Sequence, residues 1–248
     1  MTNINTFNPL ARIIALFVFT TPLLLSVDAV SASIALALTL IGAPLVGMNW
    51  KELGARAWPI FLLTPIAGIS MMLYGRPEGT EYFSFLFAHV TDNSLQLGFA
   101  IMLRVLAVAL PVVVLLGTIN PTELGDSLNQ QLKLPPRFVI AAVAGGRLIS
   151  LFRRDWESMR RSRRSRGIDR SGAFITLTFG LLVVALRRGA KLATAMEARG
   201  FGAYPRRTYA RQSHWNTRDT ILIVVCLLAS IIAITVAVVT GYFKFLGA

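Results

Sequence analysis

Long apolar runs alternate with short polar segments along most of this chain. Five runs are long enough for a helix to cross a membrane, because a bilayer core of about 30 Å needs about 20 helical residues. They are residues 10–27, 29–48, 58–74, 95–119 and 220–243. Trp58 and Tyr74 stand at the two ends of the third run, where amphipathic rings favour the membrane interface. The pattern predicts an all-α integral membrane protein with about five transmembrane helices.

Two further apolar stretches, residues 138–152 and 174–186, are shorter and are flanked by charge. Apolar residues of the second stretch recur at helical spacing, at Phe174, Leu177, Leu181 and Val184. This spacing gives a helix one apolar face. We expect both stretches to form helices that lie in or under the membrane, since runs this short are typical of interfacial or buried helices. The alternative is that both cross the membrane, which places the loop between them outside.

Proline marks the ends of two helices between these runs. Asn120-Pro121-Thr122-Glu123 combines a cap residue, a proline at the first helical position and an acid in the first turn, so it predicts a helix start. Leu134-Pro135-Pro136 ends that short helix, because proline cannot continue it. A longer helix can then begin near Arg137.

Positive charge is concentrated in one part of the chain. The 248 residues carry a net charge of +13, and residues 153–218 hold sixteen Lys or Arg against four acids. Basic loops stay on the cytoplasmic side, so we expect a cytoplasmic N-terminus, with the loop 75–94 and the C-terminus outside. The chain then divides into four transmembrane helices (1–119), a basic cytoplasmic segment (120–218) and a last transmembrane helix (219–248).

Several classes of partner and site do not fit this composition. A pI near 11.2 is compatible with nucleic-acid binding, but basic residues beside membrane helices are ordinary and no nucleic-acid-binding motif is present. We therefore expect no nucleic acid partner. Cys226 is alone in an apolar run, and His89 and His214 lie far apart, so we expect no metal and no cofactor. No small-x-small cleavage site follows the first run, which we interpret as a retained helix.

Two Arg-Gly tripeptides, Ser165-Arg166-Gly167 and Ala198-Arg199-Gly200, lie inside the basic segment. Glycine just past a helix end can take the left-handed conformation that closes the helix. The arginine before it sits at the negative end of the helix dipole, and its guanidinium can pair bidentately with a carboxylate. Either tripeptide alone is an ordinary helix end. The pair indicates two arginine-tipped helices and hence two binding grooves on a partner.

Other arginines need separate interpretations. Arg104 lies inside the fourth run, where an ionisable group is costly and either functional or structural. It could hold a carbonyl or carboxylate within the bundle, or touch another membrane subunit.

Four arginines crowd the helix before Arg166, at Arg160, Arg161, Arg163 and Arg164. We interpret them as a face toward anionic lipid headgroups rather than a direct protein contact.

The chain resembles the transmembrane T component of energy-coupling factor transporters, a branch of ABC importers for vitamins and metal ions. Segment 195–201, which reads Ala-Met-Glu-Ala-Arg-Gly-Phe after Leu-Arg-Arg-Gly-Ala-Lys at 186–191, is similar to the second family signature. Segment 118–124 with the following Leu134-Pro135 is a further match, as is Arg104 in the fourth run. The first signature normally reads Ala-Arg-Gly, and Ser165 replaces the alanine here.

This resemblance implies a scaffold protein of a bacterial or archaeal cell membrane. Its coupling helices end in the two arginine motifs, and each enters a groove on one of two ATP-binding cassette ATPase subunits. Its membrane helices hold a substrate-binding S component, which reorients to release its cargo when the ATPases close. The sequence has no G-x-x-x-x-G-K-[ST] phosphate loop, so the chain is expected to be non-catalytic and ATP hydrolysis to occur in the partners.

Two other functions compete with this interpretation. A stand-alone small permease or channel, with a basic segment that only binds lipid, needs ionisable or broken elements in several spans, and Arg104 alone is little support. A membrane-embedded enzyme needs convergent acids, histidines or a nucleophile, which the five long runs lack.

Overall fold

The computed structural model describes residues 4–26, 28–74, 81–85, 88–168, 173–201, 209 and 211–241. The chain forms two compact units. The bundle unit combines Met1–Asn120 with His214–Ala248, and the basic unit is Pro121–Ser213.

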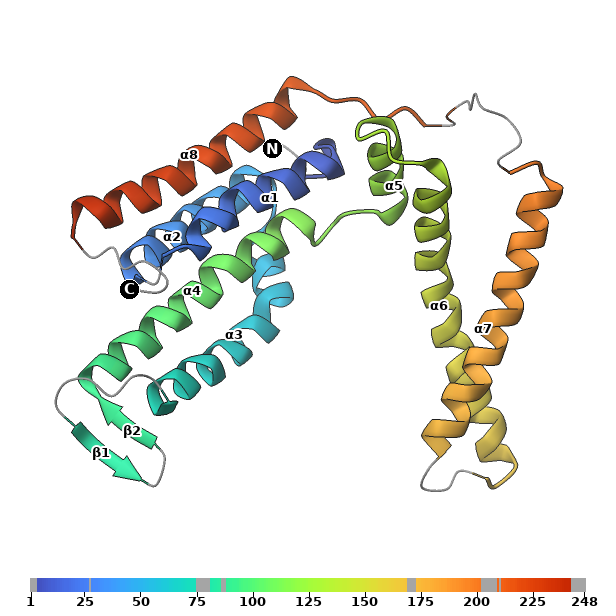
Figure 1. The fold of residues 1–248 in the computed structure, drawn as a ribbon, viewed down its shortest axis with the longest axis horizontal. Helices are drawn as coiled ribbons and strands as arrows, with labels where there is room; N and C mark the ends of the chain where they lie inside the picture. The colour runs from blue at the N-terminus through green and yellow to red at the C-terminus, as the bar shows by residue number, and fades with distance from the viewer. Residues whose placement is uncertain are drawn as a thin grey trace. The chain divides into compact units, whose positions relative to one another are not determined.

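Apolar helices build the bundle unit. After a short 3-10 helix, η1 (Ile4–Thr6), they are α1 (Pro9–Leu24), α2 (Ala29–Leu45), α3 (Trp50–Tyr74), α4 (Asp92–Leu116) and α8 (Thr217–Val239). Helix α1 packs beside α8, α3 beside α4, and α2 against both α4 and α8 (Figure 1). Each of the five predicted runs forms one of these helices, which confirms the expected all-α membrane fold.

The bundle helices differ in whether they are long and apolar enough to cross a bilayer. Within the described residues, α3, α4 and α8 are long and apolar enough to cross a membrane, whereas α1 and α2 have 16 and 17 residues. The third apolar run, residues 58–74, is part of a longer helix, because α3 begins at Trp50. Its polar first turns are helical, and Glu52 and Arg56 form an i,i+4 salt bridge of 2.7 Å there.

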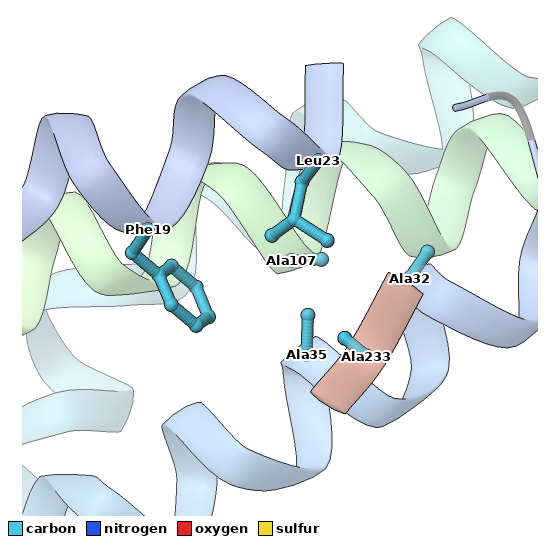
Figure 2. Close-up of a cluster of buried hydrophobic side chains, with 6 residues drawn as sticks. All are labelled: Phe19, Leu23, Ala32, Ala35, Ala107 and Ala233. Carbon is cyan, nitrogen blue, oxygen red and sulfur yellow. The ribbon is translucent and has the colours of Figure 1, made fainter. Parts of the chain in front are cut away.

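Small residues let the bundle helices approach closely. Figure 2 shows Phe19 and Leu23 of α1 in one cluster with alanines that come from three other helices, Ala32, Ala35, Ala107 and Ala233. Membrane helices associate by this kind of close backbone packing, since lipid offers no hydrophobic driving force between them.

The sequence did not indicate the antiparallel hairpin between α3 and α4, which consists of β1 (Glu81–Phe85) and β2 (Ala88–Thr91).

In the basic unit the described residues form three helices, α5 (Pro121–Gln130), α6 (Pro136–Ser165) and α7 (Ala173–Ala198). The predicted helix start at Pro121 and the break before Pro136 are confirmed. Lys133, with φ of 52°, makes the turn between α5 and α6. Among the described helices α6 and α7 are not candidate spans, although both contain the shorter apolar stretches.

Candidate functional site at the two Arg-Gly helix ends

Helix α6 ends in the first Arg-Gly tripeptide. Arg166 is the C-cap residue, with φ of −91° and ψ of 0°, and Gly167 follows with φ of +67°. The Gly167 N–H donates to the carbonyl of Arg164 at 3.0 Å, and the Ile168 N–H donates to that of Arg163 at 3.1 Å. These two bonds define a Schellman motif, which satisfies carbonyls that a helix end leaves without partners.

Helix α7 ends in the same way. Gly200 has φ of +72°, and its N–H donates to the carbonyl of Glu197 at 2.9 Å. The Phe201 N–H donates to the carbonyl of Met196, also at 2.9 Å. The prediction that glycine closes each helix in the left-handed conformation is confirmed at both ends. Both tripeptides therefore present arginine from the same backbone geometry.

The arginines at these two positions are exposed, as are Arg160 and Arg187 in the bodies of the same helices. Arg166 and Arg199 are exposed, and within the described residues neither guanidinium has a hydrogen bond or salt bridge. Arg161, by contrast, pairs with Glu157 at 3.1 Å. The two tips are charged groups without an internal role in the described part of the chain, and the dipole of each helix favours a cation there.

Side chains brace α6 against α7 where the two helices cross (Figure 1). Arg188 reaches both carboxylate oxygens of Asp155, with one contact of 2.9 Å. Arg163 donates to the Thr176 hydroxyl at 2.5 Å. Trp156 meets Phe174 edge to face, with ring centroids 5.5 Å apart. Arg163 therefore bonds to α7. The expected role of the four arginines, a face toward lipid headgroups, does not account for this contact of Arg163.

Helix α5 is held to α6 at its first turns. Arg147 donates to the Thr122 hydroxyl at 3.0 Å. A side chain at Gly125 would put its Cβ 2.4 Å from a methyl group of Val143, so the two helices touch here without space between them. The helix start after α4 and the helix that ends at Arg166 are therefore packed together.

Arg104 lies in α4 and is half-buried in the bundle unit. Its guanidinium donates to the carbonyl of Leu23, near the C-terminal end of α1, where helix carbonyls lack intrahelical partners. Asp28 is close enough to interact with it electrostatically. Asp28 itself caps α2, accepting from the N–H of Ser31 at 2.7 Å. The structure thus joins two residues that the sequence could not connect, and it gives Arg104 a bond within the bundle.

The sequence also matches a known family. The family described as cobalt transport protein (CbiQ) matches residues 2–210, which is most of the chain. The chain belongs to this family. The expected identification as a transmembrane T component of the energy-coupling factor type is confirmed.

Curated relatives carry the name energy-coupling factor transporter transmembrane protein EcfT. The one from Exiguobacterium sibiricum is 30% identical over 180 residues, which cover 66% of this chain and 68% of the relative. The one from Limosilactobacillus fermentum is 26% identical over 200 residues, 75% of this chain and 73% of the relative. The one from Bacillus subtilis is 30% identical over 162 residues, but these span only 61% of that relative.

Sequence reasoning missed two charged residues of this T component. Arg12 in α1 is 2% exposed, and Asp219 in α8 is fully buried. Arg12 lies inside the first apolar run, so the argument that singled out Arg104 could have found it. Asp219 stands just before the last run, where an acid in the first helical turn is ordinary and gives no signal. Its importance comes from contacts distant in sequence.

Proposed function

We propose that this T component couples two cytoplasmic ATPases to a substrate-binding S component in the membrane. One observation carries the proposal: two helices end in the same Schellman geometry, and each presents an exposed arginine. Two equivalent tips suit two ATP-binding subunits related by a two-fold or pseudo-two-fold axis. The cargo, a vitamin or a metal ion, is then selected by the S component.

Pairing of each tip with an acidic groove follows from arginine chemistry. The planar guanidinium can form two parallel hydrogen bonds with one carboxylate, which lysine cannot. A buried pair of this kind is costly to break, since the partner carboxylate is left uncompensated. Ser165, Arg166 and Gly167 form one proposed ATPase-binding end, and Ala198, Arg199 and Gly200 form the other.

An apolar surface on α7 supports contact with the membrane or the S component. Three of its large side chains, Phe174, Ile175 and Phe179, are 69%, 74% and 67% exposed. Leu177, three residues after Phe174, is buried. Large exposed apolar patches are rare on surfaces that face water. Helix α7 therefore suits a position against lipid or apolar protein, while its end carries Arg199.

Purification of the full chain from its native host in mild detergent tests this proposal. The wild type is compared with an Arg166→Ala/Arg199→Ala variant, and co-purifying proteins are identified by mass spectrometry. A matched control, Arg160→Ala/Arg187→Ala, removes one exposed arginine from the body of each of the same helices. We expect ATP-binding subunits with the wild type and the control, and none with the tip variant. Each tip arginine should contribute roughly 2–5 kcal/mol to binding.

Two results would contradict the proposal. A tip variant that retains full ATPase binding and full uptake would remove the role of Arg166 and Arg199. Absence of any ATPase even from the wild-type preparation would favour the stand-alone permease instead.

A further inference from the structure

The chain passes between its two units at two points. The bundle unit ends at Asn120 and resumes at His214, and everything between belongs to the basic unit. Any movement of α5, α6 and α7 can reach the bundle helices through the backbone only at these two crossings. How firmly the bundle holds each crossing therefore decides how much of that movement is passed on.

Two arginines of the bundle hold the first crossing. The Arg12 guanidinium in α1 donates to the Thr118 hydroxyl at 3.1 Å and to the Phe7 carbonyl at 3.0 Å. The Arg56 guanidinium in α3 donates to the Gly117 carbonyl at 3.0 Å. Gly117 and Thr118 directly follow α4, so two other helices fix the chain where α4 ends.

The second crossing is held by the start of α1 and by Asp219. The Asn8 side-chain amide donates to the His214 carbonyl at 3.1 Å. One carboxylate oxygen of Asp219 accepts from the Asn8 backbone N–H at 2.8 Å. The other accepts from the Asn216 backbone N–H, also at 2.8 Å. The chain that returns from the basic unit is thus tied to α1 before it enters α8.

The two charged residues at the crossings, Arg12 and Asp219, are buried, unlike the exposed residues that usually cap helices. Arg12 is 2% exposed and Asp219 is fully buried, and charged groups are almost never buried without specific partners. Asn8 and Arg12 are four residues apart, so they lie on one face of the start of α1. One helix turn therefore reaches both crossings.

We propose that Asn8, Arg12, Arg56 and Asp219 form an anchor that transmits movement of the basic unit to α1, α3, α4 and α8. They are positioning residues: they hold the backbone at Gly117–Thr118 and at His214–Asn216, and they touch neither ATP nor cargo. This inference rests on the proposed coupling function. Without the anchor, the crossings would absorb the movement, and ATP hydrolysis would continue with less transport.

The first test needs only the purified full chain. Thr118→Val keeps the shape of the side chain and removes the acceptor for Arg12, while Arg56→Gln breaks the bond to Gly117 at a partly exposed site. Hydrogen exchange is measured at Ile119, whose N–H bonds to the Leu116 carbonyl at 3.1 Å. We expect exchange there to rise about 3- to 10-fold in each variant, as for loss of one hydrogen bond.

Thr39→Val serves as the matched control for Thr118→Val. Among the described residues the Thr39 hydroxyl bonds within its own helix, to the Ala35 carbonyl at 2.8 Å, so exchange at Ile119 should not change. Asp219→Asn provides a second variant at the other crossing. An amide has one acceptor oxygen, so exchange should rise at one of the two N–H groups that donate to Asp219, Asn8 or Asn216, while exchange at Ile119 stays the same. Unchanged exchange at both crossings in all variants would overturn the anchor.

The second test uses the chain reconstituted with the ATPases and the S component that co-purify with it. We expect Thr118→Val and Arg56→Gln to assemble and hydrolyse ATP like the wild type, with at least about a threefold loss of uptake per ATP. An unchanged ratio of uptake to hydrolysis would show that the anchor does not transmit movement. If no ATPase co-purifies with the wild type, the coupling function fails, whereas the exchange test still decides whether the anchor holds the crossings.

Discussion

The glycine that follows Arg166 and the one that follows Arg199 have the tightest conformational requirement of any residue at the candidate site. Gly167 and Gly200 have φ of +67° and +72°, which costs most L-residues about 1–2 kcal/mol. A Cβ at Gly167 would meet no atom within 4 Å, so a substitution there acts through the backbone alone. Glycine at position 167 is therefore required for the backbone conformation that closes the helix and not for lack of room for a side chain.

Because a substitution at Gly167 acts through the backbone alone, two residues with different access to the left-handed region should have different effects. Gly167→Asn should retain the helix end, because asparagine visits the left-handed region, whereas Gly167→Val should open it. Hydrogen exchange at the Ile168 N–H measures closure directly, and co-purified ATPase measures the consequence. Equal exchange in the asparagine and valine variants would show that the Schellman motif does not position Arg166.

Single residues also show where sequence reasoning reached its limit. The two Arg-Gly tripeptides could be identified because their signal is local: glycine, arginine and a preceding helix stand together in the chain. Arg104 could be found as a charge in an apolar run, but its partner Leu23 could not, since the carbonyl of any helix end could have served. Asp219 gave no signal, because its partner Asn8 lies at the other end of the sequence.

At the scale of elements, proline positions and apolar runs predicted most helix boundaries. Helices α5 and α6 begin at Pro121 and Pro136, as the proline positions predict. Helix α3 begins earlier than predicted because its first turns are polar, and hydropathy cannot tell a polar helical turn from a loop. The β1–β2 hairpin was missed for the opposite reason, since the loop was analysed for charge alone.

Packing of α5 on α6 gives a prediction at this scale. Gly125→Ala would place a methyl group 2.4 Å from Val143, which is stiff at χ1 and cannot turn away easily. We expect a loss of about 1–3 kcal/mol, seen as a lower thermal unfolding temperature of the full chain. Adding Val143→Ala should recover part of this loss by making room for the new methyl group.

The control for this change lies on α6 itself. A Cβ at Gly145 would meet no atom within 4 Å, so Gly145→Ala should stabilise the helix by up to about 1 kcal/mol. Destabilisation of equal size in the Gly125 and Gly145 variants would mean that close packing of α5 on α6 is not the cause.

At the scale of the whole molecule, the charge of the loops predicts the orientation in the membrane. From the basic loops we expect the N-terminus and the basic unit in the cytoplasm and the end of α8 outside. Cys226 is the one cysteine of the chain, so Cys226→Ser gives a background for single-cysteine labelling. A membrane-impermeant maleimide applied to intact cells should label Thr240→Cys and leave Lys51→Cys and Arg137→Cys unlabelled.

Permeabilised cells provide the control for this experiment, since all three exposed positions should then react. Labelling of Arg137→Cys in intact cells would place the basic unit outside. The ATPases could not reach the Arg-Gly ends in that case, and the coupling function would be wrong.

In the proposed coupling function, docking of an Arg-Gly end would start from a backbone that is already ordered. Fixing the backbone of one flexible residue costs roughly 1–2 kcal/mol of conformational entropy, so a loop that carried the same arginine would lose several times this on binding. Here the Schellman bonds order residues 163–168 when the helix folds. A partner then has to immobilise only one side chain, at up to about 2 kcal/mol. Under the proposed coupling function, a small groove on an ATPase would therefore be enough to hold such an end.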